Sequence, residues 1–255
     1  MTGKAKSRDG GAAARSPVRL YVEAPLGQGA TVACTPPQAH YLGNVMRMRA
    51  GDELLVFNGR DGEWLAEIGA IRRGDCDLVA KERTREQVGG PDVHYLFAPL
   101  KKARLDYMVQ KATEMGVAAL RPVITRRTQA ERVNAERMRA NVIEAAEQCG
   151  VLRVPEIFEP QRLDAALHGW PAGRALIFAD EAAPIASPLA ALEAVPRGPA
   201  ALLIGPEGGF EEAERAMLRR HPFVHAISLG PRVMRADTAA VAALALVNAV
   251  LGDWR

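Results

Sequence analysis

The sequence contains little cysteine and almost no excess of charge of either sign. Its three cysteines, Cys34, Cys76 and Cys149, are widely spaced and odd in number. That pattern argues against a disulfide framework and against a structural zinc site, so we expect no metal, and it fits a reducing cytoplasm. The 33 Lys and Arg residues nearly balance the 30 Asp and Glu residues. The resulting net charge of +3 does not by itself establish nucleic-acid binding.

Long apolar runs are also missing. The longest candidate, residues 239–251, is rich in alanine and shorter than the roughly 18 residues that a membrane-spanning helix needs. We therefore predict a buried helix there and no membrane segment, and the start of the chain lacks the charged-then-apolar pattern of a signal peptide. With 48% hydrophobic and 25% charged residues among 255, the chain is expected to form one large or two modest packed domains.

Two glycine-containing turns near the C-terminus carry the strongest signal. Residues 202–210 read Leu-Leu-Ile-Gly-Pro-Glu-Gly-Gly-Phe, and residues 229–239 read Leu-Gly-Pro-Arg-Val-Met-Arg-Ala-Asp-Thr-Ala. In each, an apolar run stops at a glycine, which lets a ligand approach the backbone amides closely. One such segment alone is most often a tight turn, and neither has phosphate-loop or dinucleotide-binding spacing. If the two strands are neighbours in a parallel sheet, both turns line the crevice at the strands' carboxyl ends.

Three further segments accompany these turns in a consistent order. Residues 19–22 read Arg-Leu-Tyr-Val, residues 111–117 read Lys-Ala-Thr-Glu-Met-Gly-Val, and residues 144–150 read Glu-Ala-Ala-Glu-Gln-Cys-Gly. With them, nearly all of the chain beyond residue 16 resembles the SPOUT methyltransferases, and more narrowly the family that methylates N3 of a uridine in 16S ribosomal RNA. The resemblance implies an α/β fold in which a SPOUT domain with a parallel sheet and a trefoil knot follows a small β-rich, PUA-like barrel. It also implies S-adenosyl-L-methionine as cofactor, 16S rRNA in the 30S subunit as partner, and a homodimer.

We expect three segments along the chain. Residues 1–16 are rich in Gly, Ala, Lys and Arg and are expected to form a disordered basic tail. Residues 17–87 are expected to form the PUA-like, RNA-binding domain, and residues 92–255 the SPOUT methyltransferase domain, with the boundary in the polar stretch 86–92. Strands and helices are then expected as follows: strands at 19–22, 53–57, 63–68, 76–81, 94–98, 117–124, 175–179, 200–204 and 223–229; helices at 37–46, 105–115, 134–149, 211–220 and, capped by Asp237, 238–251.

Basic residues are concentrated in one stretch. Residues 101–139 contain ten Lys and Arg against four Asp and Glu, whereas residues 17–85 contain nine of each. A solvated face is the alternative, but the stretch begins and ends at loops that follow predicted strands, so we favour contact with RNA phosphates. Arg126 stands where the family often has Glu, and Arg19 is equally explained as an ordinary arginine at the start of a strand. The predicted RNA-binding residues are Arg19, Lys101, Lys102, Arg104, Lys111, Arg126 and Arg127.

The two glycine-containing turns supply the predicted cofactor site. Backbone amides are expected to hold the adenine and methionine parts of the cofactor, and apolar side chains to wall the pocket. The predicted cofactor-binding residues are Leu203, Ile204, Gly205, Glu207, Gly208, Gly209, Leu229, Gly230, Val233, Met234, Arg235, Thr238 and Ala239.

Two of these residues are also predicted to act in the chemistry. Uridine N3 carries a proton at neutral pH, so methylation requires its removal and a nitrogen aimed at the methyl group. Arg235 is expected to stabilise the uracil anion or to anchor a phosphate beside it; its alternative role is to cap carbonyls of a neighbouring loop. Glu207 is the candidate base, and its alternative role is to clamp the loop.

Two other functions compete with this hypothesis. One is an RNA-binding or assembly protein with a vestigial cofactor pocket, and the other is a methyltransferase with a different RNA target, such as tRNA or another rRNA base. The intact glycine-containing turns favour an enzyme, and residues 111–117 and 144–150 favour the 16S target.

Overall fold

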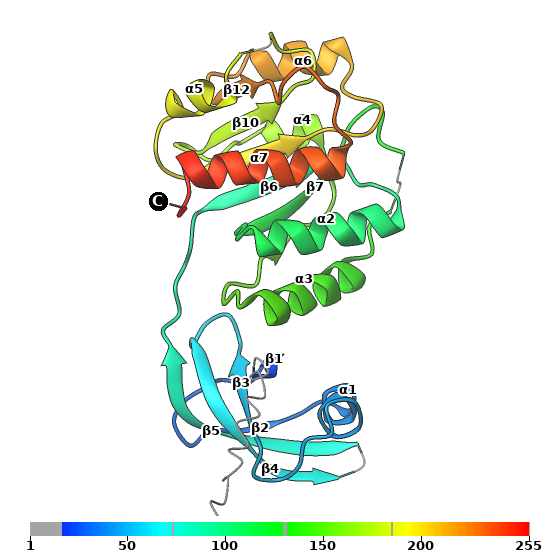
Figure 1. Cartoon of the computed structure of the whole chain (residues 1–255). Coiled ribbons are helices and arrows are strands. Elements are labelled where there is room, and N and C mark those ends of the chain that lie inside the picture. Colours follow the sequence, from blue (N-terminus) through cyan, green and yellow to red (C-terminus); the bar gives the residue numbers. More distant parts are fainter. Residues whose placement is uncertain (1–16, 73, 130–131, 185, 255) are drawn as a thin grey trace, which may run out of the picture.

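An extended segment, residues 86–92, joins two separate parts of the chain (Figure 1). The computed structural model describes residues 17–72, 74–129, 132–184 and 186–254, so the expected basic tail, residues 1–16, lies outside the described residues. No helix in the described segments is both long and apolar enough to cross a membrane.

The N-terminal part is a five-stranded sheet with a short helix. The strands run in the order β1-β3-β4-β5-β2, with β1 parallel to β3 and the other pairs antiparallel. The elements are β1 Arg19–Tyr21, β2 Thr31–Ala33, α1 Pro36–His40, the π-helical turn η1 Tyr41–Val45, β3 Glu53–Phe57, β4 Glu63–Arg72 and β5 Asp75–Arg85. Their inward-facing apolar side chains enclose a core of their own.

Most of this part was predictable. The strands expected at residues 53–57 and 63–68 are present as β3 and β4, which pair antiparallel as a hairpin. β2 was missed because it has only three residues, of which only Val32 is buried, too few for a periodic signal. The helix expected over residues 37–46 is α-helical only to His40. The chain then widens into a π-helical turn that contains Gly43, and glycine is a poor α-helix former.

The C-terminal part is a seven-stranded sheet in which every pair is parallel. The main path runs β12-β10-β11-β6-β7-β8, and β9 pairs with β7. The elements are β6 Val93–Phe97, α2 Lys102–Glu114, β7 Ala119–Ile124, α3 Ala135–Cys149, β8 Glu156–Ile157, β9 Gln161–Arg162, α4 Leu163–Leu167, β10 Ala175–Ala179, α5 Pro188–Glu193, β11 Ala200–Ile204, α6 Glu212–Arg219, β12 Val224–Ile227 and α7 Ala236–Val250. The predicted parallel sheet and its five predicted strands are confirmed, whereas β8 and β9 have two residues each and are too short for a periodic signal.

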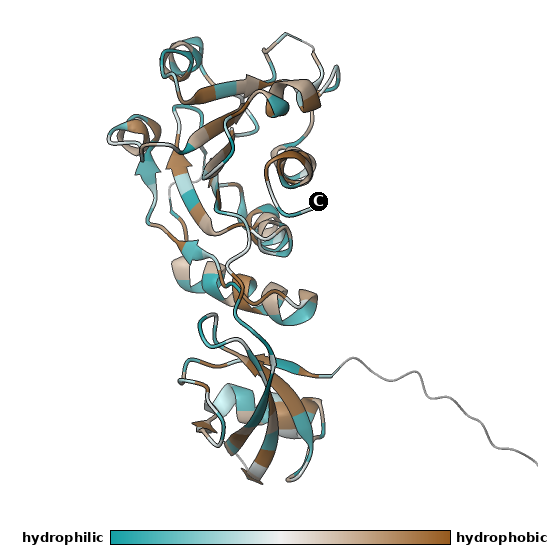
Figure 2. Ribbon diagram, turned by 90° about the vertical axis from the view of Figure 1, so that its left-hand side faces the viewer, coloured by the Kyte–Doolittle hydropathy of each residue, from teal (hydrophilic) through white to brown (hydrophobic). Residues whose placement is uncertain are grey.

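Helices cover both faces of this sheet. Tyr95 and Phe97 of β6 pack in the core formed with α2, α3 and α7, whereas Leu96 between them packs in the core formed with α4 and α6. Because both faces are buried there, the central strands β6, β10 and β11 are apolar at nearly every position, and Figure 2 shows hydrophobic stretches along the strands of this part. The same alternation places Leu202 on the first face and Leu203 on the second.

The helix ends follow local signals, with one exception. Asn134 accepts a hydrogen bond from the Arg137 N–H at 2.9 Å and Gly150 ends α3 with φ of 70°, as capping rules favour for Asn and Gly at these positions. The terminal helix α7 begins two residues earlier than predicted, at Ala236, so its N-cap is Arg235 and not Asp237. Asp237 instead lies in the first turn, where its negative charge is favourable near the helix N-terminus.

The order of the strands corrects one premise of the sequence argument. β11 and β12, which precede the two glycine-containing turns, are not neighbours, because β10 lies between them. Residues 228–235 nevertheless return from β12 across the end of β10 before entering α7, as the residues of the shared pocket show. The two turns therefore meet for a reason that periodicity does not reveal.

Candidate active site

A pocket of about 320 Å³ lies at the carboxyl ends of β10, β11 and β12. Three segments line it: residues 179–181 after β10, residues 204–209 except 208 after β11, and residues 228–236 after β12, together with Ala239 of α7. Its size falls within the range of small-molecule sites. Its position is the crevice at which open parallel sheets bind ligands.

Glycine is required at three positions of the pocket. Gly209 and Gly230 have φ of 67° and 99°, which side-chain-bearing residues rarely adopt. A Cβ added at Gly205 would collide with the ring of Phe210. A Cβ at Gly230 would meet no atom within 4 Å, so the backbone there borders open space that a ligand can occupy.

Only some of the backbone amides expected to hold a ligand are available. Among the described residues, the N–H groups of Val233 and Met234 have no acceptor. The Gly209 N–H donates to the Pro206 carbonyl at 2.9 Å and the Ala239 N–H to the Arg235 carbonyl at 2.8 Å. The second of these bonds exists because α7 starts earlier than predicted. The turn after β12 therefore offers free donors, and so does the turn after β11 at Gly205 and Gly208, whose N–H groups also have no acceptor among the described residues.

Most of the predicted cofactor-binding residues lie in this one pocket, but three do not line it. Leu203 is fully buried in the core on the opposite face of the sheet, because side chains alternate along a strand. Gly208 faces Arg127, and Thr238 is exposed on α7, where its N–H donates to the Asp237 carboxylate at 2.9 Å. The predicted residues that line it are Ile204, Gly205, Glu207, Gly209, Leu229, Gly230, Val233, Met234, Arg235 and Ala239.

The site prediction missed the contribution of β10. Asp180 and Glu181 follow this strand and line the pocket. The Asp180 carboxylate is 1% exposed and accepts from Arg215 Nε at 3.1 Å and from Arg219 Nη2 at 2.6 Å. Burial opposes the charge of Arg215, but hydrogen bonding to Asp180 and the charge of Glu181 raise its pKa above the ordinary value. Two acidic residues directly after a buried strand were the available signal.

The two residues predicted to act in the chemistry both lie on the pocket wall, but they differ in their contacts with other side chains. Arg235 is exposed and, among the described residues, no hydrogen bond or ion pair engages its guanidinium. Glu207 forms an ion pair with Arg104 of α2, with 3.4 Å between the Glu207 carboxylate and Arg104 Nη1. Arg235 is thus free to meet a ligand, whereas Glu207 ties its loop to α2.

Several of the basic residues expected to contact RNA are engaged within the protein. Lys111 pairs with Glu114 at 2.8 Å. Arg127 donates to the Gly208 carbonyl at 2.9 Å and Arg126 pairs with Glu211 at 3.2 Å. Lys101 and Lys102, at the start of α2, are exposed and have no ion pair within the described part of the chain.

Glu214 joins the loop after β7 to the turn after β11. Its carboxylate is 6% exposed. One oxygen accepts from the Arg126 N–H at 2.9 Å, and the other accepts from the Glu211 N–H at 3.0 Å. A single buried carboxylate therefore fixes the basic loop against the loop that borders the pocket.

Arg19 does not lie on an open surface. Its side chain is 10% exposed, and its guanidinium donates to Glu63 and to carbonyls at the end of α3. The sequence left RNA contact and a structural role equally open, and this geometry favours the structural role.

Comparison with known proteins gives the same picture. A family model described as an RNA methyltransferase domain matches residues 89–248, and one described as an RNA methyltransferase PUA domain matches residues 35–81. The ribosomal RNA small subunit methyltransferase E of Rickettsia conorii is 29% identical over 90% of this chain and 94% of its own length. That of Synechocystis sp. is 31% identical over 87% of this chain and 74% of its own length.

A solved structure agrees with the sequence relatives. The ribosomal RNA small subunit methyltransferase E of Neisseria gonorrhoeae, bound to S-adenosyl methionine, superimposes with a TM-score of 0.82 at 27% identity, covering 94% of this chain and all of that one. The expected fold, a SPOUT-type α/β domain after a PUA domain, is thereby confirmed. The chain belongs to the ribosomal RNA small subunit methyltransferase E family of RNA methyltransferases.

Proposed function

We propose that this protein transfers a methyl group from S-adenosyl-L-methionine to N3 of a uridine in 16S rRNA of the small ribosomal subunit. The observation that carries the proposal is the pocket formed jointly by the turns after β11 and β12, with the exposed Arg235 on its wall. Family membership supplies the reaction class, and the relatives' names supply the small-subunit rRNA.

The residues present suit this cofactor. The free amides of Val233 and Met234 among the described residues, and the open space beside Gly230, fit a ligand with polar edges lying against backbone. Ile204 and Leu229 supply apolar surface for its adenine ring. When bound, the cofactor supplies a methyl group attached to a positively charged sulfur. The rest of the cofactor then departs readily as the leaving group.

We assign Arg235 to the uracil. Its free guanidinium at the start of α7 is placed to stabilise negative charge on the base once the N3 proton is gone. Glu207 is the carboxylate on the same wall and remains the candidate base. Its ion pair with Arg104 supports a second role in holding the turn after β11.

The RNA is proposed to approach over the carboxyl edge of the parallel sheet. Lys101 and Lys102 are exposed there, and Arg126 and Arg127 lie on the next loop. We propose residues 17–87 as the RNA-presenting domain, residues 92–255 as the catalytic domain, and a trefoil knot formed where residues 228–235 return to α7. Half-buried apolar residues of α7, such as Leu246, support a homodimer, and a ribosomal substrate supports action in the cytoplasm.

The decisive experiment is mass mapping of 16S rRNA methylation. Small subunits from cells that lack the activity are incubated with the protein and S-adenosyl-L-methionine. The masses of nuclease fragments of the 16S rRNA are then measured by mass spectrometry. We expect one uridine to gain a single methyl group at N3. Methylation of tRNA or of another rRNA base would show that the protein is a methyltransferase with a different RNA target. Absence of calorimetric heat with the cofactor would favour the RNA-binding or assembly protein.

A further inference from the structure

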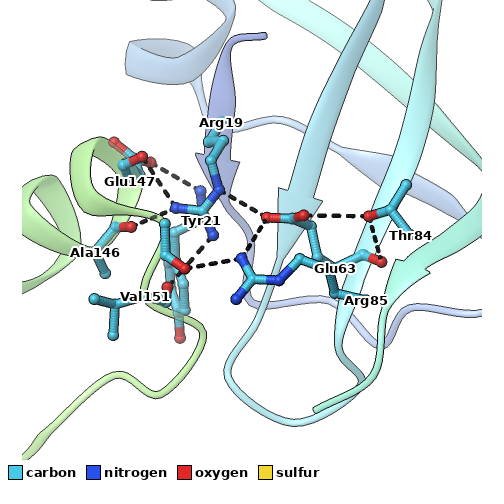
Figure 3. Close-up of polar contacts among 9 residues, drawn as sticks. Arg19, Tyr21, Glu63, Thr84, Arg85, Ala146, Glu147 and Val151 are labelled. Carbon is cyan, nitrogen blue, oxygen red and sulfur yellow. Dashed lines mark hydrogen bonds and ion pairs between the residues drawn. The ribbon is translucent and has the colours of Figure 1, made fainter. Parts of the chain in front are cut away.

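The two parts of the molecule meet at the C-terminal end of α3. Apart from the connecting segment 86–92, the contact includes a small apolar cluster with Tyr21, Phe57 and Leu152 and polar contacts beside it. Nearer the start of α3, Arg139 also pairs with Glu23, at 3.2 Å. Figure 3 shows polar contacts in which Arg19 of β1 and Arg85 of β5 reach α3 and the residues that follow it, while Glu63 of β4 pairs with both arginines. The contact is narrow, so few bonds determine how the two parts are oriented.

Arg19 lies at the centre of these contacts. Its Nε donates to the Glu63 carboxylate at 2.7 Å within the small domain. Its Nη1 donates to the Glu147 carbonyl at 3.0 Å and to the Ala146 carbonyl, and its Nη2 donates to the Val151 carbonyl at 3.4 Å. All three nitrogens are therefore occupied. The guanidinium also lies over an aromatic ring of β3, with Cζ of Arg19 4.4 Å from the ring centroid.

The acceptors that Arg19 uses belong to a helix end. The last four carbonyls of a helix have no intrahelical partner, and the helix dipole places partial negative charge there. Gly150 reverses the chain with φ of 70°, and its carbonyl accepts from Arg85 Nη1 at 2.9 Å. Two arginines of the small domain thus cap α3, which is a favourable position for positive charge.

A second contact uses a side chain of α3 as the acceptor. The Glu147 carboxylate accepts the Tyr21 N–H of β1 at 2.8 Å. Burial raises the pKa of Glu147 above its usual value, although this hydrogen bond and Arg19 act in the opposite direction. In both contacts β1 donates and α3 accepts, once through backbone carbonyls and once through a carboxylate, and together they resist both sliding and rotation.

We propose that Arg19 is a positioning residue: with Glu147, it locks the small domain in the one orientation that presents RNA to the pocket. This inference rests on the proposed function. It assigns Arg19 to the geometry of the enzyme and not to phosphate contact, because a phosphate would have to displace acceptors already in place. α3 packs on α2, whose first residues border the carboxyl edge of the sheet, so an orientation set at α3 is transmitted to the pocket by packed elements.

The test compares Arg19→Gln with Arg83→Gln. Arg83 lies on β5 and pairs only with the exposed Glu86 among the described residues, so its variant removes the same charge away from the contact. For Arg19→Gln we expect KM for small subunits to rise on the order of tenfold, which corresponds to about 1.4 kcal/mol. The kcat at saturating RNA and the Kd for S-adenosyl-L-methionine should stay within about twofold, and Arg83→Gln should match the wild type.

A second pair of variants keeps the test valid if Arg19→Gln does not fold. Glu147→Ala leaves the Arg19–Glu63 pair intact and removes the acceptor of the Tyr21 N–H, so KM for RNA should rise. Glu147→Gln retains an acceptor oxygen and should stay close to wild type. Small-angle scattering should show a broader distribution of distances between the two parts in Glu147→Ala than in Glu147→Gln.

Two results would overturn the proposal. One is an unchanged KM for RNA in Arg19→Gln or Glu147→Ala although scattering shows a loosened contact. The other is a parallel loss of cofactor affinity and kcat, which would mean that the methyltransferase part itself is disturbed. Failure of the proposed function is distinguishable, because then the wild type methylates no small subunit while the scattering comparison still reports whether the contact sets the orientation.

Discussion

Replacement of Glu214 by Gln tests whether the two loops beside the pocket depend on one carboxylate. Glu214 is 6% exposed and accepts one backbone N–H from each loop. Glutamine keeps one acceptor oxygen and turns its NH2 group toward the other N–H, which leaves a buried donor unsatisfied. Such a donor costs about 1–3 kcal/mol. We therefore expect the free energy of unfolding to fall by about 2 kcal/mol, or the Tm by about 4–8 °C for a chain of this size.

Part of that loss should appear in cofactor binding, because the turn after β11 lines the pocket. If about 1.4 kcal/mol of the lost free energy must be supplied again to order the loop when the cofactor binds, Kd for S-adenosyl-L-methionine rises about tenfold. Thermal unfolding and titration calorimetry measure the two effects. Glu212→Gln is the matched control, since Glu212 is an exposed residue in the same first turn of α6. If Glu214→Gln behaved like Glu212→Gln in both assays, the bridging role would be refuted.

Three further predictions concern the chemistry, the pocket and pH. Arg235→Ala should lower single-turnover methyl transfer by about 100-fold or more while cofactor affinity measured by calorimetry changes little; wild-type turnover would rule out its assigned role. Gly230→Val should abolish most of the heat of cofactor binding measured by calorimetry. A φ of 99° strains a branched residue, and the valine side chain would enter the open space that the cofactor needs. The control is Gly74→Val, which is also at positive φ but outside the lining of the pocket, and it should bind the cofactor normally. His94 has its pKa lowered to about 4 by burial and by Arg174. It is therefore neutral in the folded protein, so its contribution to stability is complete above pH 6.5 and is lost as the pH falls toward 4, by about 3 kcal/mol at most. Urea unfolding at pH 7 and pH 5 should show a smaller difference for His94→Gln than for the wild type, and equal differences would contradict the assignment.

Local patterns predicted local structure well. The run 200–204 reads as a buried strand and is one, and Asn134 and Gly150 mark the ends of α3 where capping rules expect them. Elements with few residues or few buried positions, such as β2 and β9, left no periodic trace. The start of α7 was misplaced because Asp237 is a good N-cap residue, whereas the tertiary path of the preceding turn brings the chain into helical geometry at Ala236.

The roles of individual charged residues were harder to predict. Composition identified the basic stretch 101–139, yet Arg127 and Arg104 hold the loop after β11 and Arg19 holds two domains together. Sequence gives the charge of an arginine but not the carbonyls and carboxylates that surround it. Those partners come from segments up to 132 residues away in the sequence, so only the folded chain shows which arginines remain free.

The sequence by itself determined the alternation of strands and helices, the apolar character of a sheet buried on both faces, and the two turns in which glycine is needed. These features depend on side-chain periodicity and backbone freedom, which act over a few residues. Tertiary structure alone decided that the turns after β11 and β12 share a pocket although β10 separates their strands, and that Glu147 and Arg19 join the two parts. Such meetings depend on strand order and helix packing, which short-range patterns do not encode.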